Sequence, residues 1–197
     1  MKKVIINAIS AAMMISIVSY CNLISGNKYV GAVLFAFGLI VVCRYSMSLF
    51  TGMAGYINKK NALEFVVVTA VNSVFAFGFG VLGSFNPAVR EKAVEVCAAR
   101  LANNLLWLFV SAIFCGILIY LGVDFYKKTG NYIGIIFSIP VFVLCGFDHT
   151  VADLFYYGAS GIYKAEDLIV LPVLIAGNLV GSNIIRGLLY AGRKEKT

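Results

Sequence analysis

Seven uncharged stretches, separated by short charged or polar segments, dominate this chain. They cover residues 4–27, 29–43, 45–58, 65–89, 101–123, 129–147 and 168–185. A helix that spans the hydrocarbon core of a bilayer needs about 20 apolar residues, so the second and third stretches are too short alone. Joined across Arg44, they make one span that contains a break. The pattern therefore predicts an all-α membrane protein, a single domain over residues 1–197, whose six helices lie at about 4–25, 29–58, 63–85, 93–123, 130–158 and 166–190.

Two of these predicted helices are interrupted, and they hold the same place in each half of a 3+3 arrangement. The second reads VCRYSMSLFTGMAGY (42–56) and the fifth reads LCGFDHTVADLFYYG (144–158). Aligning their shared Leu-Phe sets Ser48 opposite Asp153 and Arg44 opposite His149. Paired interruptions are typical of inverted repeats with a solute site near the midplane.

A break in a membrane helix frees backbone N–H and C=O groups, which lipid cannot satisfy. Each half-helix that restarts after a break also points a partly positive end inward, which favours an anion. Hydroxyl side chains are common helix caps, so we expect Ser48, Thr51 and Thr150 to cap or donate at the restarts. Gly177 and Gly181 form a GxxxG pattern, which predicts close helix packing.

Composition and charge support a membrane location. Hydrophobic residues make up 61 % of the chain and charged residues 13 %, against roughly 25 % charged in soluble domains. With the N-terminus inside, ten basic residues fall on the cytoplasmic side and four on the outside. The ten are Lys2, Lys3, Lys59, Lys60, Lys127, Lys128, Arg186, Arg193, Lys194 and Lys196; the four are Lys28, Arg90, Lys92 and Lys164. This bias predicts a multi-pass protein of the cytoplasmic membrane with both termini in the cytoplasm. The net charge of +7 is thus explained by topology and not by nucleic-acid binding.

The single histidine, His149, lies inside the fifth predicted helix between Asp148 and Asp153. Ionisable groups at membrane depth are costly and by default mark a conduction path. The five cysteines show neither a CxxC pair nor a metal-ligand spacing, so we expect neither a metal nor a cofactor. No nucleophile elbow or phosphate loop indicates an enzyme.

Four segments, in order along the chain, resemble the formate/nitrite transporter family. VGAVLFAFGLIVVC…SLFTG (30–52) is similar to its second helix, and IPVFVLCGFDHTVADLF (139–155) is similar to its fifth, with a Gly-Phe-acid-His pattern. LANNLLW (101–107) resembles its fourth helix and AGNLVGSNIIRGLLY (176–190) its sixth.

This resemblance implies an aquaporin-like homopentamer in which each six-helix protomer passes small monovalent anions such as formate, nitrite or hydrosulfide. By position in the family, one apolar constriction corresponds to Phe35, Leu39 and Leu49, with Phe50 in the same loop. The other constriction corresponds to Phe142. His149 lies between the two and faces Thr51, while Asn103 and Asn178 match the polar asparagines beside the pore.

The sequence departs from the family pattern at four places. Ser48 stands where an acid is common, and Asp153 stands where the family has an asparagine. Arg44 replaces an uncharged residue. The lysine at the external mouth of helix four has no clean counterpart, since Lys92 is out of step by about one turn.

Histidine titrates near neutral pH, with an unperturbed pKa of about 6.5. We hypothesise that His149, near Thr51, shares a proton with the entering anion, which then crosses the constrictions nearly neutral. Asp148 either orients the imidazole or caps the restarting half-helix. Asp153 either forms a buried ion pair with Arg44, or Arg44 is free to attract anions.

Several other residues and motifs allow more than one interpretation. Arg100 shows no obvious partner in the sequence. By residue type, Asn103 and Asn178 also suit hydrogen bonds between helices. Asn86-Pro87-Ala88 spells the aquaporin tripeptide, but it occurs once and in an expected external loop, where proline simply starts a helix. A neutral-solute pore and a non-transporting membrane scaffold are the competing functions.

Overall fold

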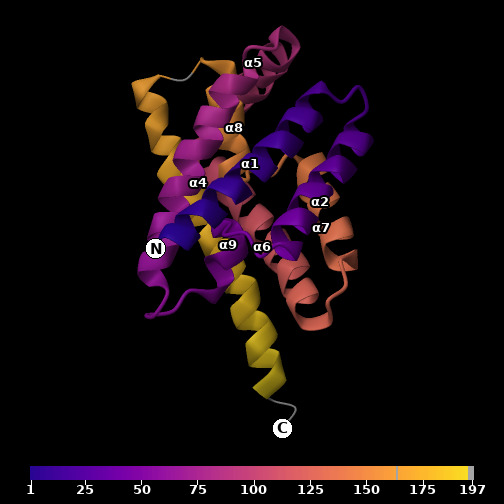
Figure 1. Cartoon of the computed structure of the whole chain (residues 1–197), viewed down its shortest axis with the longest axis vertical. Coiled ribbons are helices and arrows are strands. Elements are labelled where there is room, and N and C mark those ends of the chain that lie inside the picture. Colours follow the sequence, from indigo (N-terminus) through magenta and orange to yellow (C-terminus); the bar gives the residue numbers. More distant parts are fainter. Residues whose placement is uncertain (163, 195–197) are drawn as a thin grey trace.

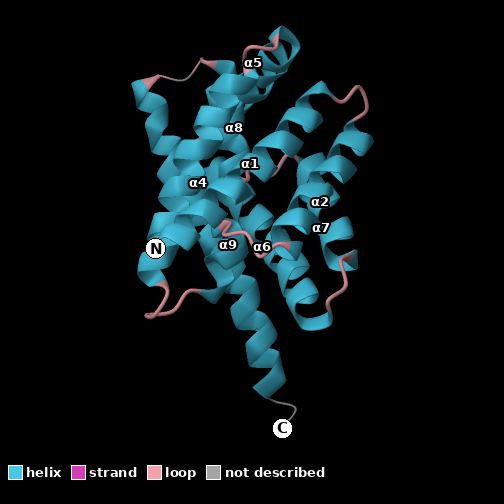
Figure 2. Ribbon diagram, viewed as in Figure 1, coloured by secondary structure: helices cyan, strands magenta, loops and turns pink. Residues whose placement is uncertain are grey.

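A computed structural model describes residues 1–162 and 164–194. Across these residues the chain is built from helices and short connections, without strands (Figure 2). The helices are α1 (Lys2–Ile24), α2 (Lys28–Arg44), α3 (Phe50–Met53), η1 (Ala54–Tyr56), α4 (Ala62–Gly83), α5 (Pro87–Leu101), α6 (Leu105–Thr129), α7 (Ile133–Cys145), α8 (Thr150–Ser160), η2 (Ala165–Ile169) and α9 (Val170–Lys194). Lys196, counted above among the cytoplasmic charges, lies outside the described residues.

The predicted all-α membrane fold is confirmed. Within the described residues, α1, α4, α6 and the helix ending in α9 are long and apolar enough to cross a bilayer singly. The consecutive helices α7 and α8 pass the same test together, with a bend of 45° between them. Figure 1 shows α5 at one end of the molecule and the C-terminus at the opposite end.

Two predicted helices differ from the observed ones. The predicted helix 93–123 is in fact α5 and α6, which are separated at Ala102–Asn104. Asn86 caps α5 and Asn104 caps α6 through their side chains, so each helix has its own start. The predicted helix 29–58 is 17 residues of α2, a break, and only the short α3 and η1. At 1.5 Å per residue α2 rises about 26 Å, which leaves the rest of the span to the segment after the break.

Backbones approach closely where glycines face neighbouring helices. A Cβ at Gly80 of α4 would lie 2.2 Å from the carbonyl oxygen of Phe155, and a Cβ at Gly158 of α8 would lie 2.2 Å from that of Phe77. The GxxxG prediction is confirmed, because a Cβ at Gly181 of α9 would lie 2.1 Å from a carbonyl oxygen of α6. These contacts fix α8 against α4 and α9 against α6.

Large apolar side chains cover much of the outer surface. Among the most exposed are Val33 (58 %), Phe37 (57 %), Leu106 (72 %), Phe137 (67 %) and Leu188 (65 %). Such a surface is costly in water and suits contact with lipid or another subunit. The small buried core and the polar groups described below lie inside this apolar shell.

Candidate functional site

The two breaks have the same backbone geometry, with a shift of 100 residues between them. At the first break Ser46 has φ 50°, and at the second Gly146 has φ 70°, so both chains turn through the left-handed region. Met47 N–H donates to Val42 O at 2.9 Å, and Phe147 N–H donates to Phe142 O at 3.0 Å. The breaks are therefore one local structure used twice.

An asparagine from a distant helix holds each restart. Asn72 of α4 accepts from Phe50 N–H (2.9 Å) through Oδ1, and its amide donates to Ser48 O (3.2 Å). Asn178 of α9 accepts from Thr150 N–H (3.1 Å), and its amide donates to Asp148 O (2.9 Å). The same amides reach Ala8 O and Ala112 O, both at 2.8 Å, on α1 and α6.

This geometry corrects the alignment drawn from the sequence. The backbone groups of Phe50 and Thr150 correspond, so Leu49 is the equivalent of His149, not Arg44. Likewise Ser48 is the equivalent of Asp148 and not of Asp153. The shared Leu-Phe occurs at different points of the two half-helices, because the position of the restart is set by the asparagines.

Ser48, Thr51 and Thr150, which were expected to cap the restarts or to donate there, are not the N-caps, although Thr150 does donate at its restart. The N-cap of α3 is Leu49, without a side-chain cap bond. The N-cap of α8 is His149, whose Nδ1 accepts from the N–H of Ala152 at 3.1 Å. Thr150 instead donates its hydroxyl to Asn178 Oδ1 at 2.8 Å.

His149 joins the two breaks. It is 2 % exposed, and its Nε2 lies 3.1 Å from the hydroxyl oxygen of Thr51, the second residue of α3. Because Ala152 N–H donates to Nδ1, that nitrogen carries no proton in this arrangement. A neutral ring then holds its proton on Nε2 and donates it to Thr51. The imidazole is thus fixed at both nitrogens and presents one N–H toward the other break.

Two phenyl rings lie beside this imidazole. Phe142 of α7 stacks on His149 with ring centroids 5.9 Å apart, and Phe35 of α2 meets Phe142 edge-on at 5.5 Å. Phe35 also approaches His149 at 6.4 Å. Phe35 and Phe142 therefore form one aromatic group, and the prediction that assigned them to two different constrictions was wrong.

The remaining apolar candidates are buried close to the first break. Leu39 is 3 % exposed, Leu49 2 % and Phe50 0 %. The Phe50 ring packs on that of Phe65 of α4, with centroids 6.2 Å apart. These side chains belong to the core cluster, and Leu49 directly precedes the restart of α3.

A cavity of about 330 Å³ leads to the histidine from the α5 side of the break, and we call it the vestibule. Its lining includes Phe35, Phe142 and His149, together with the polar side chains of Asn22, Arg100, Asn103, Asp153 and Tyr156. Asn103 donates its amide to Ala99 O at 2.9 Å, and it lines the vestibule from the turn between α5 and α6. The lining of the vestibule thus combines aromatic rings next to the imidazole with polar and charged side chains.

Arg100, which the sequence left without a partner, is the cation of this site. Its Nε lies 3.4 Å from Asp148 Oδ1, and its guanidinium pairs directly with Asp153 Oδ1. The guanidinium carbon also lies 5.2 Å from the ring centroid of Tyr156. The ion pair considered between Arg44 and Asp153 is therefore wrong. Asp148 neither caps α8 nor bonds to the imidazole, whose two nitrogens face Thr51 and Ala152.

The two other basic candidates lie away from the vestibule lining. Arg44 is exposed at the end of α2. Lys92 is exposed on α5 and pairs with Glu95 at 2.9 Å; this hydrogen bond raises the pKa of Lys92. Exposed pairs of this kind contribute little.

The sequence profile of the family described as formate/nitrite transporter matches residues 1–192. The chain belongs to the formate/nitrite transporter family. A curated relative, "Uncharacterized transporter YrhG" of Bacillus subtilis (strain 168), is 30 % identical over 189 residues, covering 83 % of this chain and 71 % of the relative.

Solved structures share the fold. A "Pentameric formate channel with formate bound" superposes with a TM-score of 0.79 at 20 % identity, covering 96 % of this chain and 95 % of that one. An "FNT family ion channel" gives a TM-score of 0.76 at 17 % identity, covering 96 % and 88 %. Membership in a family of transporters and channels makes this chain a transport protein and not an enzyme.

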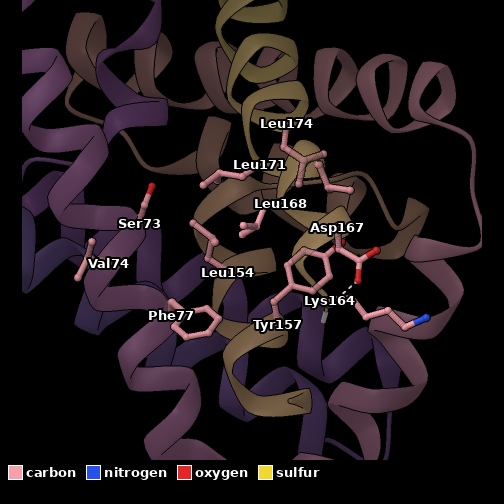
Figure 3. Close-up of a pocket in the computed structure, with 11 residues that line it drawn as sticks. Ser73, Val74, Phe77, Leu154, Tyr157, Lys164, Asp167, Leu168, Leu171 and Leu174 are labelled. Carbon is pink, nitrogen blue, oxygen red and sulfur yellow. Dashed lines mark hydrogen bonds between the residues drawn. The ribbon is translucent and has the colours of Figure 1, made fainter. Parts of the chain in front are cut away.

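A second cavity of the protein lies between α4, α8, η2 and α9 (Figure 3). It measures about 340 Å³, and its lining is largely apolar, with Phe77, Leu154 and Leu174 among the side chains drawn. Lys164 and Asp167 lie at one end, where the backbone N–H of Lys164 donates to Asp167 Oδ2 at 2.7 Å. His149, Thr51 and Arg100 do not line it, so the candidate site is the vestibule.

Proposed function

We propose that this chain forms a transmembrane path for small monovalent anions of the formate, nitrite or hydrosulfide class. The observation that carries the proposal is the buried His149, which bridges the two breaks through Thr51 and lines the vestibule. The structural likeness to a protein described as a pentameric formate channel supports the same solute class and a homopentamer with one path in each protomer. The excess of basic residues on one side supports a cytoplasmic membrane location with both termini inside.

The chemistry follows from what an anion loses in a dry constriction. Transfer of an isolated charge into apolar surroundings is costly by many kcal/mol unless donors or a proton compensate it. The Nε2–H of His149 and the hydroxyl of Thr51 are donors at the point where two half-helices begin, and half-helix N-termini also favour negative charge. The basic anions of weak acids gain further by crossing with a proton, so passage is proton-linked.

The hydrogen bonds of His149 define its part in this passage. As a neutral ring it donates through Nε2, which shares a proton with the solute without releasing it. Full transfer requires an imidazolium, whose Nδ1–H displaces the N–H of Ala152 from the cap. The proton that crosses therefore comes from the vestibule side, either on the solute or through the ring.

The test is solute flux into proteoliposomes. We expect the native protein to carry formate, nitrite and hydrosulfide faster at acidic than at neutral pH. His149→Asn keeps a side-chain acceptor for the cap of α8 but removes the ring N–H that shares a proton with the solute, and we expect it to abolish the pH-dependent uptake. Thr51→Val should slow the flux, while the matched Thr51→Ser should retain it.

Each alternative has its own signature in the same experiment. Flux of neutral solutes such as glycerol without pH dependence would indicate an aquaporin-like pore. An absence of all flux from correctly assembled protein would indicate a scaffold. Unchanged pH-coupled anion flux in His149→Asn would refute the role given to the histidine.

A further inference from the structure

Arg100, Asp148 and Asp153 form an unbalanced charge cluster at the wall of the vestibule. Their side chains are 15 %, 4 % and 0 % exposed, respectively, so water screens them poorly. Arg100 comes from the last turn of α5, Asp148 from the second break and Asp153 from the first turn of α8. The cluster holds one cation and two carboxylates, a formal charge of −1.

The cluster has one carboxylate more than it needs to neutralise Arg100. Asp148 already approaches the guanidinium, so one carboxylate suffices to neutralise Arg100. Asp153 Oδ2 lacks a hydrogen-bond partner among the described residues. A purely structural tie between α5 and α8 does not need this extra charge, and burying it is costly.

The surplus charge lies next to the path. Asp153 follows His149 by one helical turn, and its backbone N–H donates to His149 O at 2.9 Å. Both residues line the vestibule, as does Arg100. The other side chains that face the cluster, from Asn22, Asn103 and Tyr156, are uncharged amides and a phenol that cannot offset it. An anion that approaches the imidazole therefore meets a cation whose attraction is more than cancelled.

We propose that Asp153 is a specificity-determining residue, which cancels the attraction of Arg100 for anions and so admits weak acids in their neutral, protonated form. Anions of strong acids, such as nitrate and chloride, are excluded because they cannot shed their charge in the vestibule. This inference rests on the proposed function and assigns the protonation state in which the solute reaches His149.

The test compares formate with nitrate in proteoliposomes, at acidic and at neutral pH. Native protein should carry formate with strong pH dependence and carry little nitrate. In Asp153→Asn the guanidinium keeps one carboxylate partner and the cluster becomes neutral. Removal of one buried charge beside the path should raise nitrate flux about tenfold or more, and formate flux at neutral pH should rise with it.

Two further variants separate charge from fold. Glu95→Gln removes a carboxylate from the exposed pair on α5 and should leave both fluxes as in the native protein. Arg100→Gln combined with Asp153→Asn restores the cluster to −1 through Asp148, and nitrate should again be excluded. This double variant still tests the idea if Asp153→Asn alone fails to assemble, because nitrate flux through a cluster of charge −1 would contradict the charge argument.

The outcomes are distinct. Nitrate exclusion and pH dependence that persist in assembled Asp153→Asn overturn the inference, as does nitrate flux in the double variant. Native protein that carries formate and nitrate equally also overturns it while leaving the proposed anion path intact. Native protein that carries none of formate, nitrite, hydrosulfide and nitrate overturns the proposed function itself.

Discussion

The two helix breaks share a backbone and differ in chemistry. Each turns through a left-handed residue and restarts against an asparagine amide. At the equivalent N-cap position, however, the first break has Leu49 and the second has His149. The residue before is Ser48 in one and Asp148, paired with Arg100, in the other. Both halves of the repeat thus have the same backbone structure at the break, but the polar and charged side chains of the candidate site come mainly from the second break.

The comparison also shows how the two copies meet. The first restart is only four α-helical residues long, and it contributes one polar contact to the site, the Thr51 hydroxyl. The second restart is an 11-residue helix packed on α4 through Gly158. The first break is therefore short and apolar, and the second is long and carries the charged groups.

The largest expected loss of stability follows from substitution of the asparagine that holds each restart. Asn178→Leu removes four hydrogen bonds, to Thr150 N–H and hydroxyl, Ala112 O and Asp148 O. Asn72→Leu removes three. With unsatisfied buried groups at about 1–3 kcal/mol each, reduced by partial relaxation, we expect losses of about 3 and about 2 kcal/mol. Thermal unfolding in detergent measures both losses, and equal losses or the reverse order would show that the number of hydrogen bonds does not decide how much each asparagine stabilises the protein.

The next largest effect on stability compares a glycine of the long half-helix α8 with a glycine of the short half-helix α3. Gly158→Ala places a methyl against the carbonyl of Phe77 and should destabilise the protein by about 1–3 kcal/mol. Gly52→Ala in α3 meets nothing within 4 Å and should be neutral. The same unfolding assay applies to both variants. Tolerance of Gly158→Ala would mean that α8 shifts on α4 more freely than the packing indicates.

The smallest effect concerns the turn itself. Ser46 and Gly146 occupy the same left-handed position, which disfavours residues with a Cβ by about 1–2 kcal/mol. Ser46→Gly should therefore stabilise the protein by up to about 1 kcal/mol, and Gly146→Ser should destabilise it by a similar amount. Opposite signs in thermal unfolding would confirm that the two turns are interchangeable; equal signs would contradict it.

The long uncharged runs of the sequence predicted most of the membrane-spanning helices correctly. Uncharged runs identified α1, α4, α6, α9 and the broken α7–α8 pair, because spanning a bilayer imposes length and apolarity on each element. The start of α6 was missed, although Asn104 is a good N-cap and follows Asn103. The charged α5 was absorbed into the next span because its last residues are apolar enough to extend it.

The sequence predicted some contacts of the candidate site and missed others. His149 and Thr51 were named from their residue types and positions, their pairing was implied by the family resemblance, and the structure brings them within hydrogen-bond distance. The partner of Arg100 could not be found, because Asp148 and Asp153 lie about 50 residues away and meet it only after folding. The alignment of the two breaks was wrong for the same reason, because Asn72 and Asn178, which set the restarts, lie on helices distant in the sequence.

The reach of Asn178 has a consequence for biosynthesis. Its amide is on α9, the last of the described helices, yet it secures the restart beside His149 and donates to a carbonyl of α6. Until that final segment enters the bilayer, the N–H of Thr150 and the carbonyl of Asp148 lack their partner in an environment that offers no substitute. The restart beside His149 therefore gains its full set of hydrogen bonds only after α9 has packed beside α6.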